Sequence, residues 1–286
     1  MFFPHANPEN AAVRSLLQKA VRRGYTRVVE GALNHLYREG DRTGIRSRTI
    51  VITFEECWPL ASALAIDKSI SSKMDILAKV ARSFKQKDAS GLGALAWAYH
   101  EGDRSMVDLV PDPKLLPVIS DALQDPARFF EQLRLQSPKA VGNSVVNAAQ
   151  KYLPSVSWGW DKACLLSAGL FSSISGIPPV RSASTPRGFF PFWVALDKHT
   201  PQGKEAIRGI ARKLGISAIQ LRWVSFYSES TCVNEITPSP WYDAEKKWKL
   251  LNQGLSIEDV ENIWRNARDL VRNELREEAN SLHKKL

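Results

Sequence analysis

The chain of 286 residues contains only three cysteines and no long apolar run. Cys57, Cys164 and Cys232 are widely spaced and odd in number, so neither a disulfide framework nor a zinc cluster is expected. The opening residues "MFFPHANPEN" contain no basic segment followed by a long apolar stretch. No later run reaches the roughly 18 apolar residues that a membrane span requires. We therefore expect a reduced, cytoplasmic protein without a membrane segment.

The sequence also lacks the common catalytic motifs. No G-x-x-x-x-G-K-[ST] motif is present, because "TPQGKEA" has no upstream glycine and "GLGALAW" is too apolar for a phosphate loop. Neither G-x-S-x-G nor H-E-x-x-H occurs. These absences argue against ATP hydrolysis and against the commonest hydrolases and zinc enzymes, and we expect no cofactor and no bound metal.

Positive charge is abundant and concentrated near the start of the chain. The formal net charge is +9, and residues 14 to 48 carry nine cations against three acids. Such an excess favours an acidic partner, and we expect nucleic acid, DNA rather than RNA. The candidate nucleic-acid-binding residues are Lys19, Arg22, Arg23, Arg27, Arg42, Arg46 and Arg48. The alternatives are a solvated helix face, or ion pairs of Arg46 or Arg48 with Glu55 or Glu56 inside a helix bundle or between subunits.

A repeated stretch suggests a duplicated helix pair. "GALNHLYREGDR" at residues 31 to 42 returns as "GALAWAYHEGDR" at residues 93 to 104. We expect superposable helix pairs over residues 12 to 40 and 74 to 102. Gly40 and Gly102 would adopt positive φ at the helix ends, and Asp41 and Asp103 would cap the next helices along the chain.

The apolar periodicity predicts a mostly α fold. We expect an N-terminal helical-repeat module over residues 1 to 171, a linker or long surface loop over 172 to 188, and a mainly helical C-terminal module over 189 to 286 that can include short strands. One helix should end near Trp58-Pro59, another should run from Thr200 to Gly215, and a long helix should open at Ser256. The segment "LRWVSFYSES" fits either a helix or a strand.

The string "ALDKHTPQG" holds the only candidate catalytic pair. Asp197 and His199, two positions apart, could bind a metal or share a proton, with Glu229 or Glu235 as a further ligand. The alternative is a turn in which His199 and Thr200 cap the next helix.

Residues 12 to 61 resemble the collar of the replication-associated recombination ATPases of the clamp-loader superclass, the MgsA/RarA group. The matching segments are "QKAVRRG", "GALNHL", "EGD", "RSRTIVI" and the acidic pair "EE". The resemblance implies helices that hold subunits together, in proteins that act at stalled replication forks. The ATPase core of that family is missing from this sequence.

The sequence therefore favours a non-enzymatic, DNA-associated accessory or assembly protein of replication or repair, with a protein partner or a homo-oligomer as further interactions. One alternative is a metal-dependent nuclease or related phosphate enzyme that uses Asp197 and His199. The other is a pure oligomerisation scaffold in which the charge has no binding role.

Overall fold

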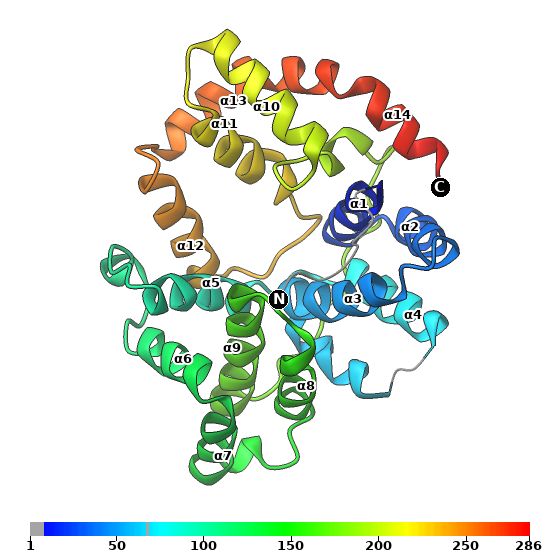
Figure 1. The fold of residues 1–286 in the computed structure, drawn as a ribbon. Helices are drawn as coiled ribbons and strands as arrows, with labels where there is room; N and C mark the ends of the chain where they lie inside the picture. Colours follow the sequence, from blue (N-terminus) through cyan, green and yellow to red (C-terminus); the bar gives the residue numbers. More distant parts are fainter. Residues whose placement is uncertain (1–8, 67–68) are drawn as a thin grey trace. The chain divides into compact units, whose positions relative to one another are not determined.

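The computed structural model describes residues 9–66 and 69–286, and these residues form an all-α fold (Figure 1). Within these ranges there is no β-strand, and the β-type pairings are isolated bridges such as the one between Lys85 and Ile236. The mostly α fold is thus confirmed, and the described C-terminal residues 189 to 286 contain none of the short strands that the sequence allowed. The helices are α1 (Glu9–Arg23), α2 (Thr26–Arg38), α3 (Arg42–Cys57), α4 (Ile70–Ala81), α5 (Asp88–His100), α6 (Leu115–Gln124), α7 (Pro126–Gln136), α8 (Ser144–Tyr152), α9 (Gly159–Ser175), α10 (Pro201–Leu214), α11 (Ala218–Ser225), α12 (Pro240–Leu251), α13 (Ile257–Glu274) and α14 (Arg276–Lys284).

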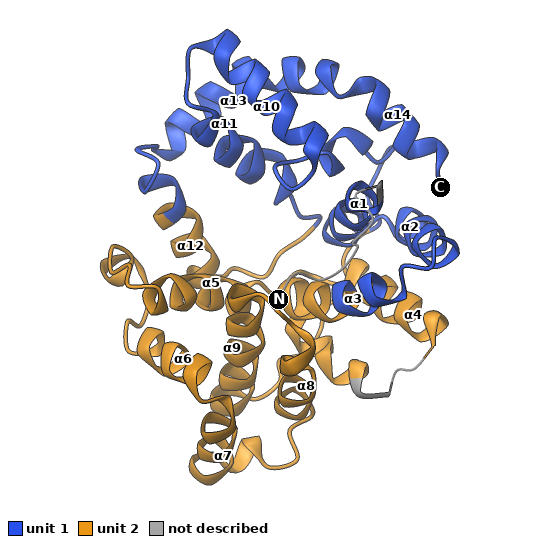
Figure 2. Ribbon diagram, viewed as in Figure 1, with its two compact units in different colours: residues 1–48, 185–234, 249–286 blue, residues 49–184, 235–248 orange. Residues whose placement is uncertain are grey.

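The chain divides into two compact units that are not consecutive in sequence (Figure 2). Unit 1 contains the described residues up to 48, residues 185 to 234 and residues 249 to 286. Unit 2 contains residues 49 to 184 and 235 to 248. One change of unit, between residues 184 and 185, falls in the expected linker. The units otherwise differ from the consecutive modules that we expected, because the first helices share a unit with the C-terminal ones.

Unit 2 is built around α9, which packs against α5, α6 and α8. Two glycines of α5 allow close approach of other backbone segments. A Cβ on Gly93 would lie 2.6 Å from the backbone nitrogen of Cys164 in α9, and one on Gly91 would lie 2.5 Å from the carbonyl carbon of Trp241. The segment "GLGALAW" is therefore a tightly packed helix, in agreement with its exclusion as a phosphate loop.

Unit 1 contains α1, α2, α10, α11, α13 and α14, together with the start of α3. α1 packs against α2 and against the short helix η5 (Phe192–Ala195), while α11 packs against α10 and α13, and α14 lies against η5. The helical stripes expected from the sequence form this core. Val13, Leu16, Leu17, Ala20 and Val21 of α1 and Val29, Ala32, Leu33 and Leu36 of α2 are all fully buried.

The repeated Glu-Gly-Asp sequence ends a helix in the same way in both copies. In both copies the backbone N–H of the glutamate donates to the carbonyl four residues earlier, that of the glycine to the carbonyl three residues earlier, and that of the aspartate to the carbonyl five residues earlier. These distances are 2.9 to 3.1 Å. This is the hydrogen-bond pattern of a Schellman motif, which requires positive φ at its glycine. Gly40 has φ of 71° and Gly102 has φ of 94°, as the sequence predicts.

The two copies differ beyond this helix end. Asp41 accepts the N–H of Gly44 at 3.1 Å and caps α3. Asp103 instead accepts the N–H of Ser105 at 2.8 Å in a local turn, which leads into a short 3₁₀ helix (Val107–Leu109). α1 and α2 pack against each other, whereas α4 packs on η1 (Trp58–Ile66) and α5 packs on α6 and α9. The expectations of a second capped helix at Asp103 and of two equivalent helix pairs are therefore wrong.

The other predicted helix boundaries agree with the structure. α3 ends at Cys57, directly before Trp58-Pro59. Thr200 caps α10, which closes at Gly215 with φ of 66°, and Ser256 caps α13. The segment "LRWVSFYSES" is helical, since it forms most of α11 and the π-helical turn η6 (Phe226–Ser230).

The predicted loop starts later than expected. α9 continues to Ser175, and the hydroxyls of Ser172 and Ser173 donate to the carbonyl of Gly169 at 2.9 and 2.8 Å. Serine composition alone suggested a loop there, but buried serines inside a helix satisfy their hydroxyls on the preceding turn.

Candidate nucleic-acid interface

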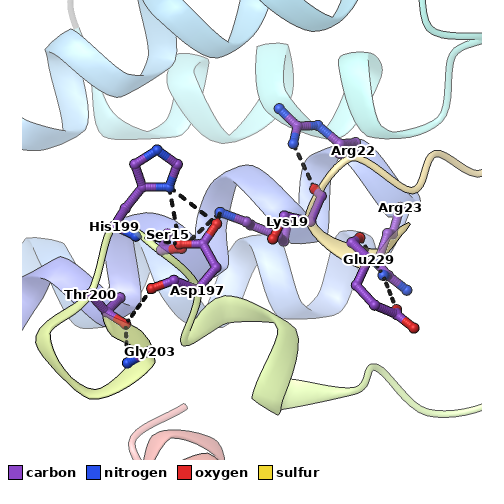
Figure 3. A network of polar contacts seen from close by, with 10 residues as sticks. Ser15, Lys19, Arg22, Arg23, Asp197, His199, Thr200, Gly203 and Glu229 are labelled. Carbon is purple, nitrogen blue, oxygen red and sulfur yellow. Dashed lines mark hydrogen bonds and ion pairs between the residues drawn. The ribbon is translucent and has the colours of Figure 1, made fainter. Parts of the chain in front are cut away.

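Lys19, Arg22 and Arg23 of α1 make polar contacts with residues of the C-terminal part of unit 1 (Figure 3). Lys19 and Arg22 are each only 2% exposed. The Lys19 ammonium lies 2.6 Å from a carboxylate oxygen of Asp197, and Arg22 donates to the carbonyl of Ser230 at 2.7 Å. These two cations therefore hold α1 to the C-terminal part of the unit and are not presented to a phosphate.

Arg23 has a similar structural role. Its guanidinium donates to the carboxylate of Glu229 at 3.0 Å and to the carbonyl of the same residue at 2.7 Å. The other carboxylate oxygen of Glu229 lies 3.2 Å from Nε of Arg268 and accepts from the indole N–H of Trp264 at 3.4 Å. Glu229 is thus the centre of an ion cluster that joins α1 and α13 through η6.

Asp197 and His199 do come together, in the turn that starts α10. The carboxylate of Asp197 accepts from the backbone N–H of His199 at 3.0 Å and from its ring Nδ1 at 3.0 and 3.1 Å. Thr200 is buried, donates to the carbonyl of Asp197 at 3.0 Å and accepts the N–H of Gly203 at 3.1 Å. This is the helix-start turn that was the alternative to a catalytic pair, but Thr200 alone caps α10, because the His199 ring bonds to Asp197 instead.

The electrostatics of the turn fix the charges of both groups. Burial raises the pKa of Asp197, but the Lys19 ammonium and the His199 hydrogen bond outweigh it and hold that pKa well below the usual value. Partial burial lowers the pKa of His199, and the neighbouring carboxylate offsets only part of this effect. At neutral pH the Asp197 carboxyl is therefore ionised and pairs with the Lys19 ammonium. His199 is neutral, and its Nδ1–H donates to the Asp197 carboxylate.

The nuclease hypothesis required a third ligand beside Asp197 and His199. Glu229 lies in the ion cluster with Arg23, and Glu235 belongs to unit 2, where it accepts the backbone N–H of Ser184 at 2.7 Å. Among residues 9–66 and 69–286, no three His, Cys, Asp or Glu side chains form a group that could hold a metal ion. The structure thus offers the nuclease alternative no metal centre in its described part.

The remaining candidate arginines are on the surface of unit 1. Arg27, Arg42 and Arg46 are exposed and Arg48 is partly exposed. The guanidinium of Arg42 lies over the ring of Tyr37, 5.5 Å from its centroid. The sequence suggested that Arg46 or Arg48 could pair with the two glutamates of α3. In unit 2 these glutamates lie close to another cation, Lys87, which is 3.5 Å from Glu55 and 3.2 Å from Glu56. Of the predicted nucleic-acid-binding residues, those on the surface are therefore Arg27, Arg42, Arg46 and the partly exposed Arg48.

Sequence reasoning overlooked an aromatic groove in unit 1. Its volume is about 580 Å³, and its walls are the segment before and within η5 and one side of α13 and α14. The residues that line it are Phe190, Phe192, Trp193, Asp269, Arg272, Asn273, Arg276, Ala279, Asn280 and His283. The signal was present in "RGFFPFW", which places four aromatic residues within five positions.

Comparison of the chain with protein-family models, with curated proteins and with solved structures found no match. No helix within the described residues is both long enough and apolar enough to span a bilayer.

Proposed function

We propose that this chain is a non-enzymatic accessory or assembly protein that binds nucleic acid, DNA in preference to RNA, in replication or repair. The observation that carries the proposal is the set of exposed arginines on α2 and at the start of α3. Arg27 and Arg38 lie on α2, and Arg42 and Arg46 lie on α3. Their planar guanidinium groups suit phosphate oxygens better than an ammonium does.

The spacing of these arginines supports a binding surface. Arg27 and Arg38 are eleven positions apart, which is close to three full helical turns, so they share one face of α2. Arg42 and Arg46 are four positions apart and share a face of α3. Between residues 24 and 47, these four exposed arginines stand against two exposed acids, Glu30 and Glu39. The excess of exposed charge is positive, which favours a polyanion.

The assembly part of the proposal rests on the resemblance of residues 12 to 61 to clamp-loader collars. These residues form most of α1, all of α2 and α3, and the start of η1. In such collars, helices of this kind hold subunits together, so we include a homo-oligomer or a protein partner in the proposed function. We place the protein in the cytoplasm, where the three free cysteines of the described part remain reduced.

Size-exclusion chromatography with light scattering tests the proposal. The purified chain is run alone, with labelled single-stranded DNA and with labelled duplex DNA, at low salt. We expect the label to co-elute with the protein at an increased mass. If the label elutes alone in both cases, nucleic-acid binding is refuted. A mass above that of the monomer in the sample without DNA supports assembly. If the mass is equally high in the samples with DNA but no label co-elutes, the oligomerisation scaffold is the remaining hypothesis.

A further inference from the structure

The aromatic groove of unit 1 has one apolar wall and one polar wall. The apolar wall is the segment 190 to 193, and the polar wall comes from α13 and α14, whose positions in unit 1 are visible in Figure 1. A volume of about 580 Å³ lies within the range of about 300 to 1,000 Å³ found for small-ligand sites. The groove therefore has room for a planar group and its substituents.

The apolar wall is a chain of packed rings. Phe192 stacks on His283 with ring centroids 4.3 Å apart and planes inclined by 23°. Phe190 packs edge-on against Phe192, at 5.3 Å, and edge-on against Tyr25, also at 5.3 Å. Trp193 is held from behind by Trp264. Each ring is fixed by a neighbour, so the wall is preorganised. Phe190 and Trp193 are buried, at 5% and 9% exposure, and Phe192 is the ring of the wall that is partly exposed to a ligand.

Phe189, directly before this wall, has no protein covering it. Its side chain is 99% exposed, the highest value among the exposed large apolar residues of the described chain. Gly188 before it has φ of 82°, a conformation that disfavours other residues and turns the chain at this point. Phe189 directly precedes Phe190 of the wall, so one exposed aromatic ring lies next along the chain to the groove, where it is free to stack on a ligand.

The polar wall carries positive charge and amide groups. Arg272 and Arg276 stand against one acid, Asp269, and all three are exposed. Arg276 donates to the amide oxygen of Asn273, which orients its guanidinium. Arginine recognises phosphate, and asparagine can donate to and accept from the edge of a base. An apolar helix of a protein partner would meet charged and amide groups on this wall, so the wall favours a polar, anionic ligand.

From this arrangement we infer that the groove binds unpaired bases of single-stranded nucleic acid. Bases stack on Phe189 and on the partly exposed Phe192, and Arg272 and Arg276 hold the phosphates beside them. Aromatic faces stack on any base, so this binding has little sequence preference. Duplex DNA is excluded from the groove because its bases are already stacked and paired. The inference rests on the proposed function and adds a preference for single strands.

The groove connects to the exposed arginines within unit 1. Tyr25, which packs on Phe190, directly precedes α2, and its hydroxyl donates to the carbonyl of Arg187 at 3.3 Å. Arg27 lies in the first turn of α2, two residues further on. A strand whose base enters the groove can therefore extend its phosphates towards the α2 arginines.

The test compares three labelled DNA probes of about 12 nucleotides: oligo(dT), an abasic strand of the same length, and a duplex. We expect oligo(dT) to bind at least about 5-fold more tightly than the abasic strand, because one stacked base contributes roughly 1 to 3 kcal/mol. Phe189→Ala should remove much of that difference and leave abasic binding unchanged. Its matched control is Leu135→Ala, an apolar side chain of unit 2 that is 79% exposed.

A second variant tests the polar wall. Arg276→Gln should weaken the binding of oligo(dT) and of the abasic strand alike, while Arg265→Gln, an exposed arginine of α13 outside the groove, should weaken both less. Because Phe189 and Arg276 are exposed, neither change should unfold the chain, and circular dichroism checks this.

The unfavourable outcomes are distinguishable. If oligo(dT) and the abasic strand bind equally well and Phe189→Ala changes neither, the groove inference fails while the proposed function stands. If none of the three probes binds at low salt, the proposed function fails together with the inference. If Phe189→Ala instead splits an oligomer and leaves DNA binding intact, the groove is an interface between copies of this chain, and the inference is overturned.

Discussion

Removing one partner of the buried pair of Lys19 and Asp197 should destabilise unit 1 by several kcal/mol. Both side chains are almost inaccessible, at 3% and 4% exposure, and the charged atoms are 2.6 Å apart. Replacing Asp197 by Ala leaves the Lys19 ammonium buried without this carboxylate. The loss of one partner from a buried pair costs about 3 to 5 kcal/mol. We therefore expect Asp197→Ala to lower the free energy of unfolding by about 3 to 5 kcal/mol.

Urea denaturation, followed by circular dichroism and tryptophan fluorescence, measures this loss. The double variant Lys19→Met with Asp197→Leu should recover most of it, because replacement of both charges removes the unpaired group. A matched control is the exposed pair of Lys213 and Glu274, at 3.6 Å, whose removal should cost no more than about 1 kcal/mol. A free energy of unfolding for Asp197→Ala within about 0.5 kcal/mol of the wild-type value would contradict the burial argument.

The same turn predicts a loss of stability in acid. The pKa values of Asp197 and His199 are both lowered in the folded state, so the unfolded chain binds protons more readily in each case. Stability from His199 should decline as the pH falls below about 6.5, and stability from Asp197 as it falls below about 3.9, the unfolded values. In Asp197→Ala the second decline should be reduced. Urea midpoints measured across this pH range test the sign.

Three further experiments give clear expectations. Gly40→Ala should destabilise the chain by about 1 kcal/mol, because φ is 71°, whereas Gly209→Ala in α10, with no atom within 4 Å of the added Cβ, should stabilise it by about 0.5 to 1 kcal/mol; thermal melts that shift in the same direction would contradict this. Burial raises the pKa of the Cys57 thiol to about 12, so a thiol reagent should modify Cys232 first and Cys57 only on unfolding, as mass spectrometry of a time course would show. Labelled DNA and RNA incubated with Mg²⁺ or Mn²⁺ should stay intact, and cleavage that disappears in His199→Ala would restore the nuclease hypothesis.

Local sequence signals predicted the helices well. The apolar stripes of α1 and α2, the glycine at the end of α2 and the caps at Thr200 and Ser256 depend on residues within a few positions of one another. The same signals failed at Asp103, because its carboxylate can also close a short turn with Ser105. The Glu-Gly-Asp sequence therefore predicts that a helix ends, but it does not determine whether another helix begins directly after it.

The candidate site was harder to predict because its partners are distant in sequence. Arg22 and Arg23 meet backbone and carboxylate groups more than 200 positions away, at Ser230 and Glu229. Nothing in the neighbourhood of α1 distinguishes the buried Arg22 and the partly buried Arg23 from the exposed Arg27. For the same reason, the sequence did not indicate that the first helices share a unit with the last ones.

The central claim, that the exposed arginines of unit 1 bind nucleic acid, is tested most directly by the salt dependence of DNA affinity. Arg22 and Arg23 are unsuitable for this test because they hold the fold together, so the variant replaces Arg27, Arg42 and Arg46 by Gln. With duplex DNA, each lost phosphate contact lowers the log-log slope by about 0.9, so a decrease of about 2 to 3 is expected.

The matched control replaces three exposed cations of unit 2, Lys114, Arg128 and Lys139, by Gln, which removes the same formal charge. We expect the control to bind duplex DNA with a slope within about 1 of the wild type. Equal slopes for the wild type and the Arg27, Arg42 and Arg46 variant, or an equal decrease in the control, would contradict the account.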